Sequence, residues 1–431
     1  VGRGVPVGRN GLQGKDASEG RGAPVDRHAL QGMDASGGRG VPVGRNGLQG
    51  MDASGGRGVP VGRNGLQGKD ASEGRDAPEG RHTTQGRQSL QDRQPLQDRQ
   101  TGPAAPAATF AADIGGTWVR MRVGGADAPV ERAPSPSRLR HPDRSTARLR
   151  ADMVALLGDR VPAGARAALS FGAAIDHLTG TVYGSAPLWG DEAAPYDLAA
   201  DLRRRRPDVT WHLVNDVTAA LLDFAAVHAR PGTRRVAYLT VSSGIALRVA
   251  DLERTRIPVD AWGLQGEVGH LPVPLTDPGA DVLAGLPCEC GATDHLASVA
   301  SGPGLVRAAR RLGLPDAPQV ADWLPGALAS DDPGARRLLE LCAAPVAQLL
   351  RTLWCLDPHL DLIGIGGGVA EGLGAPYAAE IRRRLSIATS YADRGRDDAW
   401  LDDRLVFCGP GQVDALRGVR RVGDWIPGVS R

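Results

Sequence analysis

Residues 110–125 read FAADIGGTWVRMRVGG, and this stretch decides the fold of the chain. Two short apolar runs flank Gly115 and Gly116, a pattern that predicts a β-hairpin. Asp113 stands near the end of the first run, and the two glycines after it let backbone N–H groups approach a phosphate closely. Thr117 adds a hydroxyl donor. The stretch therefore predicts the start of a folded core and one side of a phosphate site, with a plain hairpin turn as the alternative to the phosphate site.

Beyond this hairpin, strand-like apolar runs alternate with helical ones. The expected elements are apolar runs at 165–175 and 211–215, an Ala-rich helix at 217–229, a strand at 235–245, a long helix at 335–356, a buried strand with a glycine turn at 361–372, and a closing amphipathic helix at 411–425. This alternation predicts an α/β fold.

The N-terminal region has a different character. An 18-residue unit, RGVPVGRNGLQGKDASEG, repeats there with copies that begin at Arg3, Arg21, Arg39 and Arg57. Each copy offers a few Val and Leu among Gly, Pro and charged residues, which is too little apolar surface to offset chain entropy. We expect residues 1–106 to be a disordered tail of repeats and linker, with a flexible tether or nucleic-acid-binding arm as the alternative.

Charge and hydropathy exclude several classes of protein. The 51 basic and 49 acidic residues leave a formal charge of +2, which argues against a broad nucleic-acid surface. No apolar run has the length of a membrane span, and the opening lacks the apolar region of a secretory signal. We therefore expect a cytoplasmic protein without nucleic-acid or membrane partners.

The foldable part is long enough for two domains around one cleft. We expect a small α/β domain made of 107–216 and about 410–431, and a large α/β domain made of 217–409.

Two polar motifs follow the hairpin. Asn215 and Asp216 end a strand just before a helix, where Asp216 at a cleft edge can accept a proton from an alcohol; an Asn-Asp pair is also a common helix N-cap. Glu267 and His270 lie between glycines in GEVGH, and sugar hydroxyls require such paired donors and acceptors.

A compact set of sulfur and nitrogen ligands comes next. Cys288, Cys290 and His295 lie within eight positions of one another, and His270 can complete a tetrahedral zinc site. A reducing compartment disfavours a disulfide. The alternative to structural zinc is a loop with free thiols.

Taken in order, these motifs resemble the ROK family of sugar kinases and repressors, which has the two-domain actin-like/hexokinase (ribonuclease H-like) architecture with a central cleft. The resemblance spans 110–425. The residues that carry it are DIGGT at 113–117, ND at 215–216, GEVGH at 266–270, CECG at 288–291 with His295, and IGIGGGVAEG at 363–372.

The resemblance implies a kinase that uses ATP and Mg²⁺, holds a structural Zn²⁺ and binds a sugar or cyclitol; we also expect a homodimer. Asp216 would be the catalytic base. The substrate would contact Asn215, Asp216, Glu267 and His270. The ATP side would comprise Asp113, Gly115, Gly116, Thr117, Ser243, Gly244, Gly366, Gly367 and Gly368. The zinc ligands would be His270, Cys288, Cys290 and His295.

The chain departs from the family pattern at several positions. His295 replaces the third zinc cysteine, Ala297 replaces a sugar-binding Glu, and the usual Asn is missing from 184–189. The second phosphate loop, GTGIGGG in the family, reads SSGIALR at 242–248, where Cβ atoms restrict the approach of backbone to phosphate.

The expected function is ATP-dependent phosphorylation of a primary hydroxyl on a hexose or a related polyol such as a C7-cyclitol. The altered second loop favours a catalytically weak sugar-binding relative as the first alternative. A sugar-responsive transcriptional repressor is the second, and it lacks support because residues 1–106 show no helical apolar period for a recognition helix.

Overall fold

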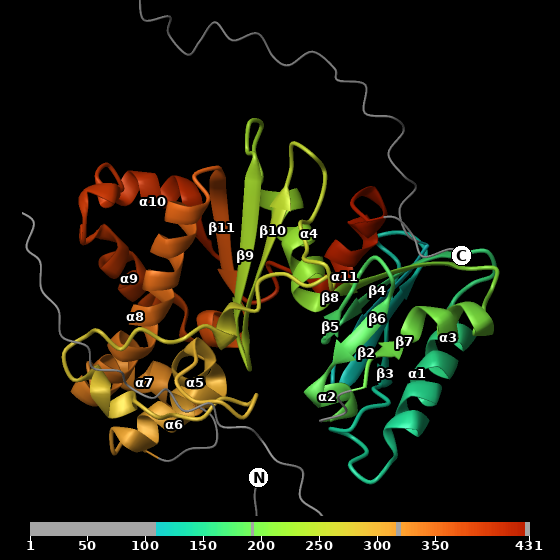
Figure 1. The fold of residues 1–431 in the computed structure, drawn as a ribbon, viewed down its shortest axis with the longest axis horizontal. Helices are drawn as coiled ribbons and strands as arrows, with labels where there is room; N and C mark the ends of the chain where they lie inside the picture. Colours follow the sequence, from blue (N-terminus) through green and yellow to red (C-terminus); the bar gives the residue numbers. More distant parts are fainter. Residues whose placement is uncertain (1–108, 191–193, 316–319, 427–431) are drawn as a thin grey trace, which may run out of the picture. The chain divides into compact units, whose positions relative to one another are not determined.

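The computed structural model describes residues 109–190, 194–315 and 320–426 (Figure 1). Contacts divide the chain into two units, Val1–Asp92 and Arg93–Arg431, and every described residue belongs to the second. The predicted repeat tail, 1–106, lies outside the described residues.

A five-stranded sheet begins the fold, with strand order β3-β2-β1-β4-β8. Its strands are β1 (Phe110–Ile114), β2 (Trp118–Val123), β3 (Val130–Pro134), β4 (Arg166–Phe171) and β8 (Thr210–Asn215). The antiparallel β1–β2 pair confirms the predicted hairpin. Strands β1, β4 and β8 are parallel, so their carboxyl ends share one edge of the sheet.

Helices cover one face of this sheet, and a small sheet adjoins it. The covering helices are α1 (Thr146–Arg160) and α3 (Leu198–Arg205), whose buried leucines share a core with β1 and β4. The small sheet is formed by β5 (Ala174–Ile175), β6 (Thr181–Gly184) and β7 (Tyr196–Asp197), and the short helix α2 (Ala186–Trp189) lies between β6 and β7 in the chain.

A four-stranded sheet, β10-β9-β11-β12, organises the rest of the described chain. Its strands are β9 (Arg235–Val241), β10 (Ile245–Asp251), β11 (Leu360–Gly366) and β12 (Leu405–Phe407). The prediction of one strand over 235–245 is wrong, because residues 242–244 form the turn of an antiparallel hairpin between β9 and β10. Ser and Gly are common turn residues, so the run SSG marks this break.

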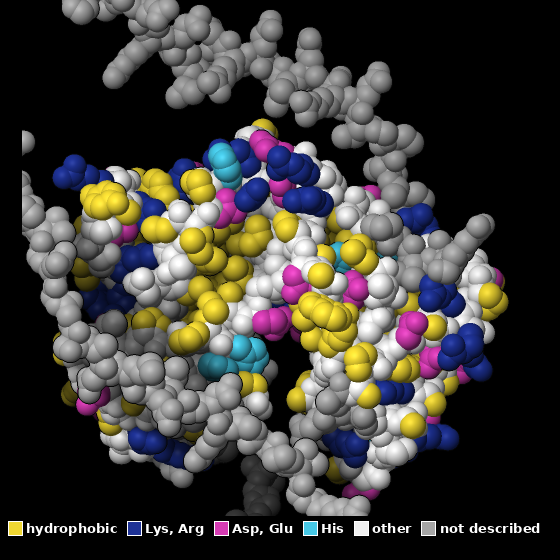
Figure 2. All heavy atoms as spheres, viewed as in Figure 1, with side chains coloured by type: hydrophobic (Ala, Val, Ile, Leu, Met, Phe, Trp, Pro, Cys, Tyr) yellow, Lys and Arg dark blue, Asp and Glu magenta, His cyan; other side chains and the backbone are white. Residues whose placement is uncertain are grey.

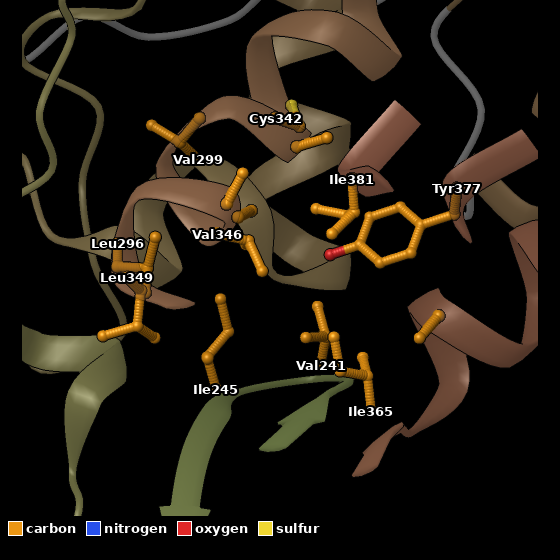
Figure 3. Packing of buried hydrophobic residues seen from close by; sticks show 14 of the residues in the cluster. Val241, Ile245, Leu296, Val299, Cys342, Val346, Leu349, Ile365, Tyr377 and Ile381 are labelled. Carbon is orange, nitrogen blue, oxygen red and sulfur yellow. The ribbon is translucent and has the colours of Figure 1, made fainter. Parts of the chain in front are cut away.

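Helices pack on both faces of this sheet (Figure 1). One face carries α5 (Leu296–Ala300), α6 (Gly302–Arg311), α7 (Leu324–Ala329), α8 (Pro333–Leu356), α9 (Gly368–Ser386) and α10 (Asp398–Arg404). Figure 3 shows Val241 and Ile245 from the hairpin facing Val346 of α8 across this core. The helix α4 (Asp216–His228) packs against the other face.

The C-terminal helix is shorter than predicted. In place of one helix over 411–425, α11 (Ala415–Gly418) continues into a 3-10 helix, η6 (Val419–Asp424). Gly418 lies so close to the carbonyl oxygen of Ala219 in α4 that a Cβ atom there would overlap it. This close packing of Gly418 against α4 accounts for the shorter helix, and the local sequence pattern does not predict it.

Helix α8 is long and apolar enough to cross a membrane by length and composition alone. In the structure, 61% of its most apolar window is buried inside the protein, where it forms part of the core. A buried core helix satisfies the same test, so α8 is weak support for a membrane span. The predicted division into domains 107–216 with 410–431 and 217–409 stays a prediction.

Candidate active site

Polar side chains collect at the shared carboxyl edge of β1, β4 and β8. The register pairs Asp113 with Ser170, and the Ser170 hydroxyl donates to Asp113 Oδ1 at 2.9 Å. Arg120 donates to Asp113 Oδ2 from Nε at 3.1 Å and from Nη2 at 2.7 Å. The same Nη2 donates to Asp414 at 2.7 Å. Asp113 is therefore a fixed carboxylate at the first strand end.

Asp216 follows β8 directly at the same edge, as the first residue of α4. Asn215 is the N-cap: its Oδ1 accepts the Val217 N–H at 2.9 Å, and its Nδ2 donates to the Ala173 carbonyl at 2.9 Å. The Val217 N–H also donates to Asp216 Oδ1 at 2.9 Å. The N-cap alternative is thus confirmed for Asn215, and it orients Asp216 at the strand end.

The ionisation of Asp216 is shifted toward the neutral range. Burial of the carboxyl raises its pKa, and the negative charge of Asp113 raises the pKa as well. Together they bring it to about 6. The Val217 N–H and the positive charge of Arg248 act in the opposite direction. A carboxyl with this pKa is deprotonated at pH 7 and is still basic enough to accept a proton.

The DIGGT turn lies beside this edge between β1 and β2. Gly115 donates its N–H to the Trp118 carbonyl at 3.1 Å, and Thr117 is exposed. A Cβ atom at Gly116 would come within 2.7 Å of Pro187, so α2 packs directly on the turn. The glycine at 116 is therefore required for packing, while a Cβ atom at Gly115 would make only an ordinary contact, 3.6 Å from the Trp118 carbonyl oxygen.

A cavity of about 520 Å³ opens beside the β9–β10 turn. It lies between the beginnings of α6 and α9, and residues that line it include Ser242, Ser243, Gly302, Val306, Arg307 and Gly368. Within the turn, the Ser242 N–H donates to the Gly244 carbonyl at 2.8 Å, and Ser243 and Gly244 are exposed. The predicted second phosphate loop thus borders the cavity.

The three glycines at the end of β11 have different surroundings. Gly368 lines the cavity. Gly367 has φ +92°, and a Cβ atom there would come within 2.6 Å of Thr240 Oγ1. Gly366 lies against the hydroxyl of Tyr238, without room for a side chain. Only Gly368 of the three borders the cavity, and the other two allow the close approach of β11 to β9.

Arg307 of α6 also borders the cavity, and the sequence motifs did not indicate it. Its Nη1 donates to Glu289 Oε1 at 2.8 Å, between the two cysteines of the zinc motif. Its Nε and Nη2 are buried and have no hydrogen-bond partner among the described residues. One arginine among many carries no local sequence signal, so only the fold reveals this link.

The altered loop continues into β10, where Leu247 is buried in the core. The predicted restriction of this loop on phosphate stays a prediction. Arg248 is buried, and its Nη2 donates to Glu267 Oε1 at 2.8 Å. The predicted substrate residue Glu267 is therefore paired, while 43% of its side chain stays exposed.

Four predicted zinc ligands come together. The ligand atoms of His270, Cys288, Cys290 and His295 all lie within 4.8 Å of one another. Cys288 Sγ is 3.7 Å from His270 Nδ1, and Cys290 Sγ is 3.3 Å from His295 Nδ1. Tetrahedral zinc bonds of about 2.1 Å to nitrogen and about 2.3 Å to sulfur separate ligand atoms by roughly 3.4–3.8 Å. These two distances are close to that range, and the cluster is consistent with the family's metal motif.

Acidic and histidine side chains also gather visibly on the molecular surface. Figure 2 shows them along the borders of a hollow on the face viewed. These observations give a carboxyl with a raised pKa at a strand end, a cavity beside a glycine turn, and a thiol–imidazole cluster.

Residues 109–390 match the pattern that defines the ROK family. The chain belongs to the ROK family. It is 43% identical over 325 residues to the 2-epi-5-epi-valiolone 7-kinase of Actinoplanes sp., covering 71% of this chain and 90% of that protein. It is 34% identical over 357 residues to the C(7)-cyclitol 7-kinase of Streptomyces hygroscopicus subsp. jinggangensis, covering 73% and 95%.

Solved structures share the fold. The ROK hexokinase from Thermus thermophilus is 23% identical with a TM-score of 0.53, covering 73% of this chain and 96% of that one. A ROK family glucokinase from Streptomyces griseus, solved with glucose and AMPPNP, is 18% identical with a TM-score of 0.53, covering 73% and 98%. The predicted family and α/β actin-like fold class are confirmed, and a kinase of this family implies ATP.

Proposed function

We propose that this protein transfers a phosphoryl group from ATP to the exocyclic primary hydroxyl of a C7-cyclitol, with Asp216 as the general base. The protein is a ROK kinase, a phosphotransferase with an alcohol acceptor, and its relatives from Actinoplanes and Streptomyces are cyclitol 7-kinases. The observation that carries the mechanism is the Asp216 carboxyl at the strand edge, with its pKa raised to about 6.

Asp216 takes the proton of the attacking hydroxyl. ATP with Mg²⁺ supplies the phosphoryl group and offsets the charge that develops in the transition state. Asp113, fixed by Arg120 and Ser170, presents a carboxylate on the phosphate side of the same edge. The two carboxylates lie at one edge of the sheet, Asp113 in β1 and Asp216 after β8, with β4 between the two strands. Asp216 would serve the alcohol, and Asp113 the metal–phosphate side.

The cavity beside the β9–β10 turn is the proposed nucleotide site. Gly115, Gly116 and Thr117 would border the phosphates from one side, and Ser243 and Gly244 from the other. The nucleoside would lie near Gly368, with Gly366 and Gly367 shaping the strand behind it. The cavity lining supports the roles of Ser243 and Gly368, and the exposure of the turn supports that of Gly244. The roles of the other glycines and of Thr117 follow from the family resemblance.

The polyol would contact Asp216, Glu267 and His270. We propose that zinc at His270, Cys288, Cys290 and His295 is structural, because all four tetrahedral positions are taken by side chains. The metal would hold the chain next to Glu267 without entering the reaction. Asn215 would act through its cap on Asp216.

A cyclitol is favoured over a hexose as the acceptor. The relative that is 43% identical is named for 2-epi-5-epi-valiolone, and Ala297 replaces a hydroxyl-binding Glu of the family. A site without that partner discriminates differently among polyols. We further propose a cytoplasmic homodimer without nucleic-acid or membrane partners.

The test is a coupled ADP-release assay on a panel of C7-cyclitols, hexoses and N-acylhexosamines. The highest kcat/KM is expected for a C7-cyclitol. Higher kcat/KM with a hexose would overturn the substrate assignment, and ADP release with no acceptor on the panel would favour the weak sugar-binding alternative.

A further inference from the structure

Arg248 is a buried cation paired with the candidate substrate residue Glu267. It lies on β10, and only 4% of its side chain is exposed. Its Nη2 donates to Glu267 Oε1 at 2.8 Å, and its Nη1 donates to the carbonyl oxygens of Leu247, at 2.9 Å, and of Gln265. A buried guanidinium is costly unless it is paired and hydrogen-bonded. Here one carboxylate and two carbonyls hold it in one orientation.

The backbone next to Glu267 is held against β10 by contacts that do not involve Arg248. The Leu247 N–H donates to the Gly266 carbonyl at 2.8 Å. The Gln265 side chain exchanges hydrogen bonds of 2.7 and 3.3 Å with the backbone of β10. Arg248 therefore adds something that the backbone does not supply, which is a fixed direction for the Glu267 carboxylate.

The positive charge of Arg248 also changes the pKa values of Asp216 and His177. It lowers the pKa of Asp216, against the burial of that carboxyl and the charge of Asp113, which both raise it. Burial lowers the pKa of His177; Asp176 opposes this shift, and Arg248 adds to it. Arg248 thus belongs to the same electrostatic environment as the candidate base.

We propose that Arg248 is a positioning residue for phosphoryl transfer, which orients the Glu267 carboxylate toward the polyol. The proposal rests on the proposed function, since Glu267 and Asp216 serve a polyol only in such a kinase. A carboxylate fixed before binding loses less side-chain entropy when it accepts substrate hydroxyls. Because its nitrogens are directed at protein acceptors, Arg248 acts through other residues.

The experiment compares Arg248→Gln and Arg248→Lys in the full chain. Arg248→Gln is expected to raise the polyol KM about tenfold, the size of coupling typical of paired residues, while the ATP KM stays unchanged. Removal of the positive charge raises the pKa of Asp216, so the acidic limb of the kcat/KM profile should move to higher pH. Arg248→Lys keeps the charge, so it should raise the polyol KM and leave the limb in place.

Two further variants separate positioning from general damage. In Glu267→Gln the partner of Arg248 is already lost, so adding Arg248→Gln should raise the polyol KM little further. Arg230→Gln is the control, because Arg230 forms an exposed ion pair with Asp403 at 3.0 Å. It should leave KM, kcat and the pH profile unchanged.

An unchanged polyol KM and pH profile in Arg248→Gln, with wild-type melting temperature, would overturn the proposal. If Arg248→Gln does not fold, an unchanged polyol KM in Arg248→Lys would also overturn the proposal. If the wild type phosphorylates no polyol, the proposed function fails separately. Calorimetric binding of a C7-cyclitol then decides: weaker binding by Arg248→Gln supports the positioning role, and equal binding overturns it.

Discussion

Asp216→Asn is expected to inactivate the protein and to stabilise it at neutral pH. The amide keeps the shape of the side chain and an oxygen that can accept the Val217 N–H, a contact of 2.9 Å. It cannot take a proton from the attacking hydroxyl. Loss of a positioned general base costs about 10²- to 10⁴-fold in rate, or about 3 to 5 kcal/mol of barrier.

The gain in stability follows from the pKa of Asp216. Folding raises it from the ordinary 3.8 to about 6. A carboxyl whose pKa is raised by folding stabilises the folded protein in its protonated form, fully below about pH 4. This stabilisation is lost as the pH rises through about 6. At pH 7 a pKa shift of this size lowers the stability of the folded protein by at most about 3 kcal/mol. The actual cost is smaller, because solvent reaches the half-buried side chain. The neutral amide avoids this cost.

Steady-state kinetics and thermal melting at pH 4 and pH 7 test both consequences. Turnover should fall at least about a hundredfold, and the melting temperature should rise by a few degrees at pH 7 and change little at pH 4. Retention of more than a tenth of wild-type turnover would show that Asp216 is not the base. An unchanged melting temperature at pH 7 would contradict the unfavourable ionisation of the carboxyl.

Three other changes test the remaining parts of the site. Asp113→Asn should raise the KM for MgATP and lower kcat, because the carboxylate lies on the phosphate side; calorimetry should find polyol binding unchanged, and weakened polyol binding would contradict this division. Elemental analysis should find about one zinc per chain, and Cys288→Ser should lower both the zinc content and the melting temperature, because structural zinc contributes folding energy; zinc-free protein of full stability would refute the metal assignment. Arg307→Ala should weaken binding of a fluorescent ATP analogue several-fold, because Arg307 borders the cavity with two buried donors that lack partners among the described residues; unchanged affinity would remove Arg307 from the nucleotide site, and Arg336→Ala, at an exposed ion pair with Asp331, is the control.

The sequence predicts the fold class and the location of the site because both depend on local patterns. The hairpin around Gly115 and the helix start at Asp216 follow from turn and capping preferences that act over a few residues. The four zinc ligands were predicted from type and spacing, and the fold brings them within 4.8 Å.

Contacts between distant segments could not be predicted in this way. The pairing of Arg248 with Glu267 and that of Arg307 with Glu289 join segments 19 and 18 positions apart, through side chains with no distinctive motif. The C-terminal helix was predicted too long because its end depends on Gly418 packing against α4. The strand at 235–245 was predicted too long because its buried residues continue on both sides of the SSG turn.

The most direct test is to incubate the full chain with MgATP and 2-epi-5-epi-valiolone and to locate the new phosphate by ³¹P–¹H correlation NMR. We predict a phosphate monoester on the oxygen of the exocyclic CH₂–OH group, formed in step with ADP and absent with Asp216→Asn. A phosphate on a ring hydroxyl, or no phosphoester on any C7-cyclitol when a hexose is phosphorylated efficiently, would contradict the assignment of this protein as a cyclitol 7-kinase.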